Sequence, residues 1–482
     1  MGKALDLGLD VGTQGTKALV IDVDSRAVVA RAASSYELLP GLPAGAAEQH
    51  PDTWWNAVRA CLRDLGSACD LARVRALGVA GQQHGFVALD ERRAVLRPAK
   101  LWCDTSTAAE ARELSSVLAR HVPTGFTASK ILWLKRHEPA RFARLAHVLL
   151  PHDWINFRLT GELSMEAGDA SGTGLFDPTA RRFDARACFS IDAGLAAKLP
   201  RLLGPREAAG RLTTEAAREL GLPAGVLVAP GGGDNMCAAI GAGATRPGVV
   251  VLSLGTSATV FAHSKTPVLD PEGLIAPFCD STGGHLPLLC VMNATSVLHE
   301  VARACGQDLA TLTRAAEGVA PGAEGLCFLP FLQGERVPDL PEATGTLLGL
   351  RTGTLTSGHL FRAALEGISL NLASGVERLR RLGLAVESAR LVGGGAKNAL
   401  WAAILADALE APVQRLAEDE SAALGAALQA AWVAEGGALV LSDLVERFVS
   451  FQGDPARPDH ERSRVYRAAR ARFEREVQRL YR

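Results

Sequence analysis

The strongest constraint on the fold is a short motif that occurs near the start of each half of the chain. Residues 5–11 (LDLGLDV) are typical of a buried strand, and a glycine turn, GTQGT, leads into a second strand-like run at 17–23. Residues 249–254 (VVVLSL) lead into GTSAT and continue as VFAHS, so that Gly12 aligns with Gly255 half a chain length away. Each copy predicts a β-hairpin, and the repeat predicts a duplicated pair of domains.

The rest of the chain predicts α/β architecture in both halves. Strand-like segments such as RALGVAG and GVLVAPG alternate with helical patterns such as ALWAAILADALEA, which begins at residue 399. Such alternation is typical of layered α/β domains. Pro and Gly follow an Ala-rich helix at 244–248, so we expect an N-terminal domain at 1–245 and a C-terminal domain at 246–482. Small-molecule sites are common between domains, so a ligand cleft is expected there.

The composition excludes several classes of protein. The 51 Lys and Arg nearly balance the 52 Asp and Glu, which argues against a nucleic-acid partner. No uninterrupted apolar run reaches ~20 residues, and Asp6 and Asp10 interrupt the N-terminal segment, so neither a membrane span nor a signal peptide is predicted. The nine cysteines include no C-x-x-C pair, which favours reduced thiols over disulfides or zinc. We therefore expect a cytoplasmic protein without a membrane partner.

The Arg-rich stretch after Arg462 has two readings. Its apolar residues recur at spacings of three or four, at Tyr466, Ala469, Phe473, Val477 and Leu480. This pattern predicts an amphipathic helix, which either binds a membrane surface or docks on its own domain. Glu474 and Glu476 interrupt the positive charge and favour the docked helix.

The first glycine turn is rich in groups that can donate hydrogen bonds to phosphate oxygens. It reads Gly12-Thr13-Gln14-Gly15-Thr16-Lys17. Glycine lets the main chain approach a phosphate closely, but the turn fits neither the P-loop nor the dinucleotide fingerprint, and a plain hairpin turn is the alternative. Asp10 closes the preceding apolar strand, where a buried carboxylate needs a cation or donor groups. Beside bound phosphates, magnesium is its natural partner.

Two further glycine turns lie in the second half. Residues 254–257 include Gly255 and Thr256 and offer the same donors as the first turn. Residues 393–398 (GGGAKN) connect the strand-like ARLV to a helix that begins near Leu400. The free N–H groups there suit a phosphate or an adenosine lying on the backbone, and a plain loop is the alternative.

Two segments place polar side chains at the ends of apolar strands. In PGGGDN at 230–235, Asp234 is either the N-cap of the following helix or a general base that accepts the proton of a substrate hydroxyl during phosphoryl transfer. In GQQHG at 81–85, Gln83 and His84 suit hydrogen bonds to a polyol. The alternative for a lone His is a packing role.

Three longer segments carry a resemblance to a known family. They are GFTASKILWL at 125–134, FLPFLQGER at 328–336, and the segment from GTLLGL to HLFRAALE at 345–366. With the glycine turns, they make the chain similar to the FGGY carbohydrate kinases from Leu7 to about Ala430, most closely to members that phosphorylate xylulose. The resemblance implies two RNase H-like domains of the actin-like ATPase fold that close on ATP and a sugar. It assigns no chemistry to 328–336, Arg336 included.

The resemblance also implies roles for the residues described above. Asp234 matches the catalytic base, and Asn235 accompanies it at the sugar. Gln83 and His84 lie where the xylulose-specific members carry a pair that ends in His, often Met-His in bacteria. The implied cofactors are ATP and Mg²⁺, with Asp10 near the metal. The implied nucleotide-binding residues are Gly12, Thr13, Gln14, Thr16, Lys17, Gly255, Thr256, Gly394, Gly395 and Asn398.

The implied reaction is ATP-dependent phosphorylation of D-xylulose to D-xylulose 5-phosphate. Gln83 departs from the family pattern, and so does WCDTST, which lacks an Arg shortly after Asp104. The alternatives are a kinase for another ketopentose or polyol, such as ribulose, and a non-catalytic actin-like sensor of ATP or sugar. Trp102 and Asp104 stay undecided between pocket wall and core, and the oligomeric state, a homodimer included, stays open.

Overall fold

The computed structural model describes residues 4–481, and these fall into two compact units. Residues 4–245, 277–286 and 420–448 form the first unit, and the second contains 246–276, 287–419 and 449–481. The chain therefore returns to the first unit after most of the second has been formed. The expected N-terminal domain at 1–245 and C-terminal domain at 246–482 stay predictions, as does the family-derived expectation that the first carries the sugar and the catalytic base and the second the nucleotide.

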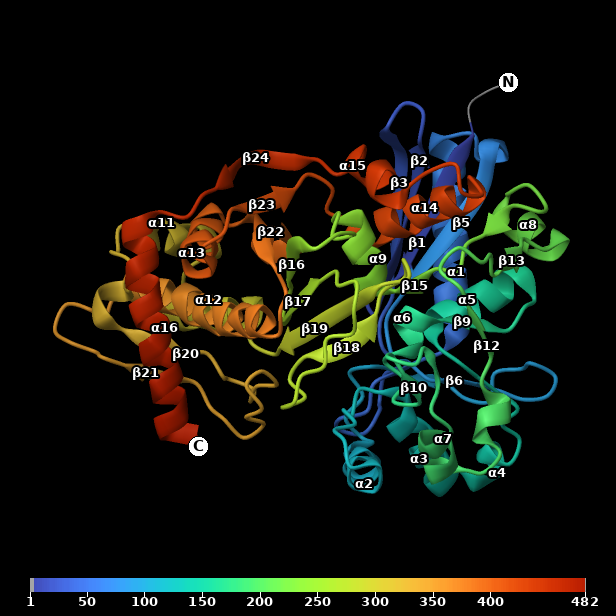
Figure 1. The fold of residues 1–482 in the computed structure, drawn as a ribbon, viewed down its shortest axis with the longest axis horizontal. Helices are drawn as coiled ribbons and strands as arrows, with labels where there is room; N and C mark the ends of the chain where they lie inside the picture. The colour runs from blue at the N-terminus through green and yellow to red at the C-terminus, as the bar shows by residue number, and fades with distance from the viewer. Residues whose placement is uncertain (1–3, 482) are drawn as a thin grey trace. The chain divides into compact units, whose positions relative to one another are not determined.

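A mixed seven-stranded sheet forms the centre of the first unit (Figure 1). Its strands, in spatial order, are β13 (Gly210–Arg211), β14 (Leu227–Val228), β5 (Val74–Gly81), β1 (Leu5–Val11), β2 (Gly15–Asp22) and β3 (Ala27–Ser35), and β15 (Gly232–Gly233) pairs with the end of β5. Strand β1 is antiparallel to β2 and parallel to β5, which in turn is parallel to β14. The expected hairpin with a glycine turn is the β1–β2 connection.

The second sheet repeats this topology. Its order is β18 (Ala276–Cys279), β19 (His285–Val291), β17 (Ala258–Ala262), β16 (Gly248–Leu254), β22 (Val386–Val392), β23 (Val413–Leu416) and β24 (Phe451–Ala456). Strand β16 is antiparallel to β17 and parallel to β22, just as β1 is to β2 and β5. The prediction of a duplicated α/β pair is confirmed.

Helices cover both faces of the first sheet, so every residue of β1 except Asp10 is buried, although only Leu5, Leu7, Leu9 and Val11 form an apolar face. Alternate residues of a strand point to opposite faces. Leu7 and Leu9 belong to the core that contains Trp54 of α1 (Pro51–Ala68). Gly8 points instead at α14 (Ser421–Ala434), whose backbone comes so close that a Cβ on Gly8 would lie 1.9 Å from the carbonyl oxygen of Ala423.

The same close approach recurs around α14. A Cβ on Gly78 of β5 would lie 2.2 Å from the carbonyl oxygen of Ala426. A Cβ on Gly425 of α14 would lie 1.8 Å from the carbonyl oxygen of Cys237 in α9 (Asp234–Gly241). Glycine is therefore required on both sides of these contacts, because no side chain can yield when the obstacle is backbone.

Smaller elements complete the first unit. Its further helices are α2 (Ala108–Leu118), α3 (Thr127–His137), α4 (Pro139–Phe142), α5 (Pro151–Thr160), α6 (Ala167–Ala170), α7 (Ala185–Ile191), α8 (Thr214–Leu220) and α15 (Leu441–Glu446). Short strand pairs are β4 (Glu48–Gln49) with β7 (Ala99–Lys100), β6 (Val87–Leu89) with β8 (His147–Leu149), β9 (Ser164–Glu166) with β12 (Arg201–Leu203), and β10 (Phe176–Asp177) with β11 (Arg182–Phe183).

The second unit is built around a long buried helix, α12 (Ser357–Arg381). It also contains α10 (Thr295–Cys305), α11 (Leu309–Glu317), α13 (Ala399–Leu409), α16 (His460–Tyr481) and the pair β20 (Cys327–Leu329) with β21 (Thr346–Leu348). Helix α16 packs against α12, which it crosses at a steep angle in Figure 1, and places Tyr466, Phe473 and Val477 in the core, as expected of the docked helix. Within residues 4–481, no helix combines the length and the hydrophobicity needed to cross a membrane.

The contact between β1 and α14 makes a stability prediction. Gly8→Ala should lower the free energy of unfolding by at least about 1–3 kcal/mol, because the new methyl group overlaps a backbone carbonyl. Gly66→Ala is the matched control: its methyl group would lie 3.5 Å from Leu71, and alanine is better than glycine within a helix. Urea unfolding of both variants checks this, and an unchanged midpoint for Gly8→Ala would contradict the packing described here.

Candidate active site

Three turns of the first unit meet at the carboxyl ends of β1, β5 and β15. The backbone N–H of Gln82, just after β5, donates to the carbonyl of Val11 at 2.9 Å. Gly232 and Gly233 of β15 pair with the last residues of β5. The glycine turn at 12–17, the pair Gln83–His84 and the pair Asp234–Asn235 are therefore neighbours in space, although they are far apart in the sequence.

Asp234 is the first residue of α9, and Gly233 is the N-cap. The N-cap alternative for Asp234 is therefore wrong, because the chain already has helical geometry at this residue. Its Oδ1 accepts hydrogen bonds from the backbone N–H (2.8 Å) and the side-chain amide (2.9 Å) of Asn235. Burial, with the negative charge of Asp10 added, raises the pKa of Asp234 to about 7. A carboxyl group with this pKa suits a proton acceptor at neutral pH.

Asp10 is the second carboxyl group of this site. Burial raises its pKa to about 6, and Lys17 opposes that shift. The ammonium group of Lys17 is itself 2.6 Å from Glu420, so its charge is shared. Two carboxyl groups that hinder each other's ionisation would be relieved by a cation.

The residues present fit Mg²⁺ if the substrate supplies further oxygen ligands. Magnesium is commonly held by one or two carboxylates together with phosphate oxygens and water. Within residues 4–481, no group of three or more His, Cys, Asp or Glu side chains could hold a metal by itself. Asp10 is therefore a candidate ligand for a cation that arrives with phosphate.

Gln83 is buried and hydrogen-bonded to the residue beside Asp234. Its Oε1 accepts from the side-chain amide of Asn235 at 2.9 Å. Its Nε2 is also buried and has no hydrogen-bond partner in the described structure. A buried donor without a partner costs about 1–3 kcal/mol, so this amide is a natural contact for a ligand oxygen.

His84 lies against aromatic side chains. Its ring centroid is 4.9 Å from that of Phe126 and 5.7 Å from that of Phe278. Its backbone is left-handed (φ 65°), and its carbonyl accepts from the hydroxyl of Thr127. A Cβ on Gly172 would lie 1.8 Å from the imidazole, so the ring is closely surrounded. The packing reading of His84 is thus partly correct, and its contact with a sugar stays a prediction.

Trp102 holds the first glycine turn and is not a core residue. Its indole N–H donates to Thr13 Oγ1 (2.9 Å), which donates to Gln82 Oε1 (3.0 Å). The side-chain amide of Gln82 donates in turn to the carbonyl of Gly12 at 3.2 Å. The indole is only partly buried, so Trp102 lies at the edge of the site.

The side chains of the turn point in different directions. Gln14 and Lys17 are exposed, whereas Thr16 is fully buried and its hydroxyl is 3.3 Å from that of Tyr36. The Tyr36 hydroxyl donates to the carbonyl of Gly12 at 2.7 Å. The structure therefore places the Thr16 side chain beneath the turn, where it supports the backbone.

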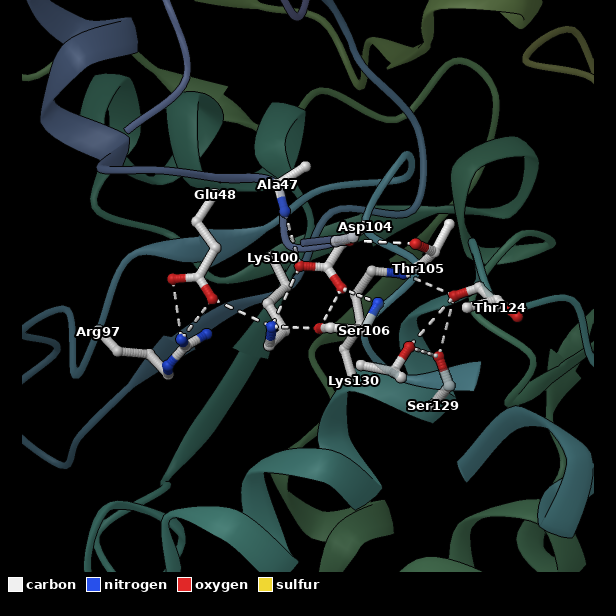
Figure 2. A network of polar contacts seen from close by, with 12 residues as sticks. Ala47, Glu48, Arg97, Lys100, Asp104, Thr105, Ser106, Thr124, Ser129 and Lys130 are labelled. Carbon is white, nitrogen blue, oxygen red and sulfur yellow. Dashed lines mark hydrogen bonds and ion pairs between the residues drawn. The ribbon is translucent and has the colours of Figure 1, made fainter. Parts of the chain in front are cut away.

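Asp104 belongs to the core and is part of a buried network of charges (Figure 2). It lies 3.1 Å from Lys100, which is also 3.0 Å from Glu48. Glu48 in turn accepts two hydrogen bonds from Arg97. Removal of one partner from such a network leaves an uncompensated buried charge, which is strongly destabilising.

Lys130 connects this region to the aromatic wall beside His84. The side chain is completely buried within α3, and its ammonium group donates to the carbonyl oxygen of Thr124 (Figure 2). It also donates to the carbonyl oxygens of Gly125 and Phe126. These bonds fix the backbone that presents the Phe126 ring. Lys130 lies in the segment 125–134 that carried the family resemblance, but its contacts could not be read from the sequence.

In the second unit, the structure brings together the other two glycine turns. Gly255 and Thr256 are exposed between β16 and β17. Gly393 has a φ of 85° and packs so closely that a Cβ would lie 2.8 Å from the carbonyl oxygen of Leu254. Both turns therefore lie at the ends of the neighbouring parallel strands β16 and β22. Gly394 is exposed, whereas Gly395 is buried.

Asn398 is the N-cap of α13. Its Oδ1 accepts from the backbone N–H of Trp401 at 3.0 Å, and its amide donates to the hydroxyl of Thr313 at 3.0 Å. The side chain thus fixes the start of the helix that follows the glycine turn. Both polar atoms of the Asn398 side chain are therefore engaged within the protein. Its contact with adenosine stays a prediction.

Glu335 is a positioning residue that sequence reasoning missed. The buried carboxylate accepts from the backbone N–H of Met292 (2.6 Å) and from the side-chain amide of Asn293 (3.0 Å). The loop that it holds then hydrogen-bonds to the glycine turn, because the backbone N–H of Thr295 donates to the carbonyl of Gly255 at 3.0 Å. This gives a structural role to the segment 328–336, whose chemistry the sequence left unassigned.

The duplicated topology is that of the actin-like ATPase fold. Residues 5–241 match the N-terminal domain of the FGGY family of carbohydrate kinases, and residues 250–434 match its C-terminal domain. The chain belongs to this family and is a carbohydrate kinase.

Similar proteins match over nearly the whole chain. The xylulose kinase of Haemophilus influenzae is 37% identical over 98% of this chain and 100% of its own length. The xylulose kinase of Streptomyces coelicolor is 39% identical over 90% of this chain and 88% of its own. The crystal structure of xylulose kinase from Rhodospirillum rubrum superimposes with a TM-score of 0.89 at 32% identity and covers 99% of both chains.

The electrostatic link between the two carboxyl groups can be tested directly. Asp10→Asn should bring the pKa of Asp234 below its value of about 7, because it removes a negative charge that opposes ionisation. Carboxyl-labelled aspartate followed by ¹³C NMR against pH measures this, with Asp234→Asn to assign the signal. Glu420→Gln, which alters the partner of Lys17, serves as the control. An unmoved Asp234 titration in Asp10→Asn would show that the two groups do not interact.

Proposed function

We propose that this protein is a xylulokinase, which transfers the γ-phosphoryl group of ATP to the C5 hydroxyl of D-xylulose and releases D-xylulose 5-phosphate. The observation that carries the proposal is the carboxyl group of Asp234, whose pKa is raised to about 7 beside the amides of Asn235 and Gln83. The xylulose kinases that match over nearly full length support the choice of sugar.

In this proposal, Asp234 accepts the proton of the sugar hydroxyl as the oxygen attacks phosphorus. The unpartnered amide of Gln83 and the side chains of His84 and Asn235 hold the open-chain sugar so that the hydroxyl is in line with the phosphate. Such positioning can contribute ~7–11 kcal/mol to lowering a barrier. When the sugar hydroxyl gives its proton to Asp234, its oxygen becomes a better nucleophile toward the γ-phosphate.

The glycine turns would bind the nucleotide. The backbone N–H of Gln14 and the hydroxyl of Thr256 would donate to phosphate oxygens, with Lys17 nearby and Thr16 as support from below. Gly12 and Gly255, whose own N–H groups donate within their turns, would let the phosphate approach the main chain. Thr13 would hold the first turn in shape through its hydrogen bond to Gln82. Gly394, Gly395 and Asn398 would face adenosine. Mg²⁺ beside Asp10 would offset negative charge on the phosphates. We place the enzyme in the cytoplasm, where ATP is available, and a homodimer remains a prediction.

A kinase for another ketopentose is the second candidate, and Gln83 is the observation that favours it. Its amide can both donate and accept, which the Met of the common family pair cannot do. A pocket that gains a hydrogen-bonding group can prefer a different arrangement of hydroxyls. Ribulose is therefore the first competitor to test.

A substrate panel decides between these sugars. ADP release should be measured with Mg-ATP and D-xylulose, D-ribulose, L-ribulose, L-xylulose or glycerol. We expect the highest kcat/KM with D-xylulose and a product phosphorylated at C5. A preference for another sugar would move the specificity and leave the kinase assignment intact, whereas no sugar-stimulated release would favour the sensor.

The base is tested by Asp234→Asn, which should bind sugar and ATP but lose roughly 10²–10⁴ in kcat, the usual contribution of a general base. In the unsubstituted enzyme the carboxylate is the active form, so kcat/KM should rise with pH and level off above about pH 7. The variant should lose this acid limb. Near-normal turnover, or an acid limb that persists in the variant, would refute the role of Asp234.

A further inference from the structure

Four buried ionisable side chains cluster behind the turns that carry the proposed sugar site. They are His152, Asp153, Glu166 and Asp169, each almost or completely inaccessible to solvent. They come from α5, from the end of β9 and from α6, all in the first unit (Figure 1). Buried charges are costly unless they are paired, and the proposed phosphoryl transfer uses none of the four.

Two members of the cluster hold the backbone at the start of a helix. Asp153 accepts from the backbone N–H of Leu150 at 2.9 Å, just before α5. Glu166 is the N-cap of α6 and accepts from the backbone N–H groups of Gly168 and Asp169. These contacts account for two of the three acids by local structure. They leave His152 and Asp169 to be explained.

His152 and Asp169 pair with each other. The Nδ1 of His152 lies 2.6 Å from Oδ2 of Asp169, and its Nε2 lies 3.3 Å from Oδ1 of Asp153. Burial lowers the pKa of His152, but the carboxyl groups of Asp153, Asp169 and Glu166 outweigh burial and raise it to about 9. The carboxyl groups therefore favour the protonated imidazole, and its short contact with Asp169 is an ion pair when His152 carries that proton.

This ion pair lies against both turns of the proposed sugar site. A Cβ on Gly81, two residues before Gln83, would lie 2.6 Å from Cβ of His152. A Cβ on Gly231, three residues before Asp234, would lie 3.2 Å from Cδ2 of the His152 imidazole. The backbone N–H of His84 also stabilises the charged form of Asp169. One pair of side chains thus contacts the backbone of two segments that are remote in sequence.

We propose that His152 and Asp169 form a positioning pair that fixes the Gln83–His84 turn relative to Asp234 and so sets the geometry of sugar binding. This inference rests on the proposed function, because it assumes that these two turns hold the sugar. Neither residue contacts the reacting atoms in this scheme. Both act through the backbone that they support.

The pair also contributes to the electrostatics of Asp234. The negative charge of Asp169 adds to burial and to Asp10 in raising the pKa of Asp234. The other titratable groups facing this region are Asp153, Glu166 and the thiol of Cys237, whose pKa the surrounding carboxylates and burial raise. A neutral residue at 169 should therefore ease the ionisation of Asp234, a change that mere loosening of the fold would not produce.

The experiment compares the full-length wild type with Asp169→Asn, His152→Gln and a control, Glu366→Gln. Glu366 is a buried acid of the second unit, paired with Arg362 at 2.7 Å, and it has no part in the proposed site. We expect both site variants to raise KM for the sugar by roughly 10- to 100-fold, as a misplaced buried hydrogen bond would do. KM for ATP should stay within about twofold of wild type, a smaller change than the loss of one hydrogen bond would cause. The acid limb of kcat/KM should move to lower pH in Asp169→Asn, and Glu366→Gln should change neither KM.

Several outcomes would overturn the inference. One is an unchanged sugar KM in folded Asp169→Asn and His152→Gln. Another is a loss of kcat of the same size in both variants while KM for sugar and KM for ATP stay at their wild-type values. If His152→Gln does not fold, two other measurements test the inference. They are the sugar KM of the isosteric variant Asp169→Asn and the sugar affinity of the wild type as a function of pH. That affinity should weaken as His152 loses its proton near pH 9, and a flat profile would count against the pair. Absence of sugar turnover by the wild type would refute the proposed function itself, and the inference with it.

Discussion

The burial of β1 and β5 on both faces determines where this protein can do chemistry. A strand covered by helices on both sides has no position for an unpaired polar side chain except at its ends. The polar groups of the first unit follow this rule, since Asp10 lies near the end of β1 and Gln83 follows β5. Asp234 begins the helix after β15. The helix α14 that seals one face comes from residues 421–434, so the completed site depends on a segment far along the chain.

The close packing of helices on the sheet also explains why glycine is needed at several positions outside the proposed sugar and nucleotide sites. Gly8 and Gly78 admit the backbone of α14. Gly81 admits the backbone and Cβ of His152, and Gly231 admits its imidazole. Each of these residues lies in or next to a strand that leads to a site residue. A side chain there would displace the support before it disturbed the site itself. The fold and the site are therefore stabilised by the same close contacts.

Much of this could be predicted from local pattern. The strands at 5–11 and 249–254, the helix from residue 399 and the duplicated topology were predicted by apolar runs, glycine turns and their repeat, all of which are local signals. The N-cap reading of Asp234 was wrong because the choice between Gly233 and its neighbour depends on one backbone angle. The network of Lys100 with Glu48 and the anchoring by Glu335 could not be predicted, because their partners are distant in sequence.

The two copies of the hairpin motif differ at one position that matters for their chemistry. Asp10 precedes the first turn, whereas the aligned position before the second turn is Ser253. The turns also differ in length, because Val11 pairs with Thr16 across residues 12–15, whereas Leu254 pairs with Ala258 across residues 255–257. A carboxylate beside phosphate is favourable only with a cation between them, and a hydroxyl needs none. The repeated hairpin therefore carries an acidic side chain before the first turn alone, and the role of this carboxylate beside a metal-bound phosphate stays a prediction.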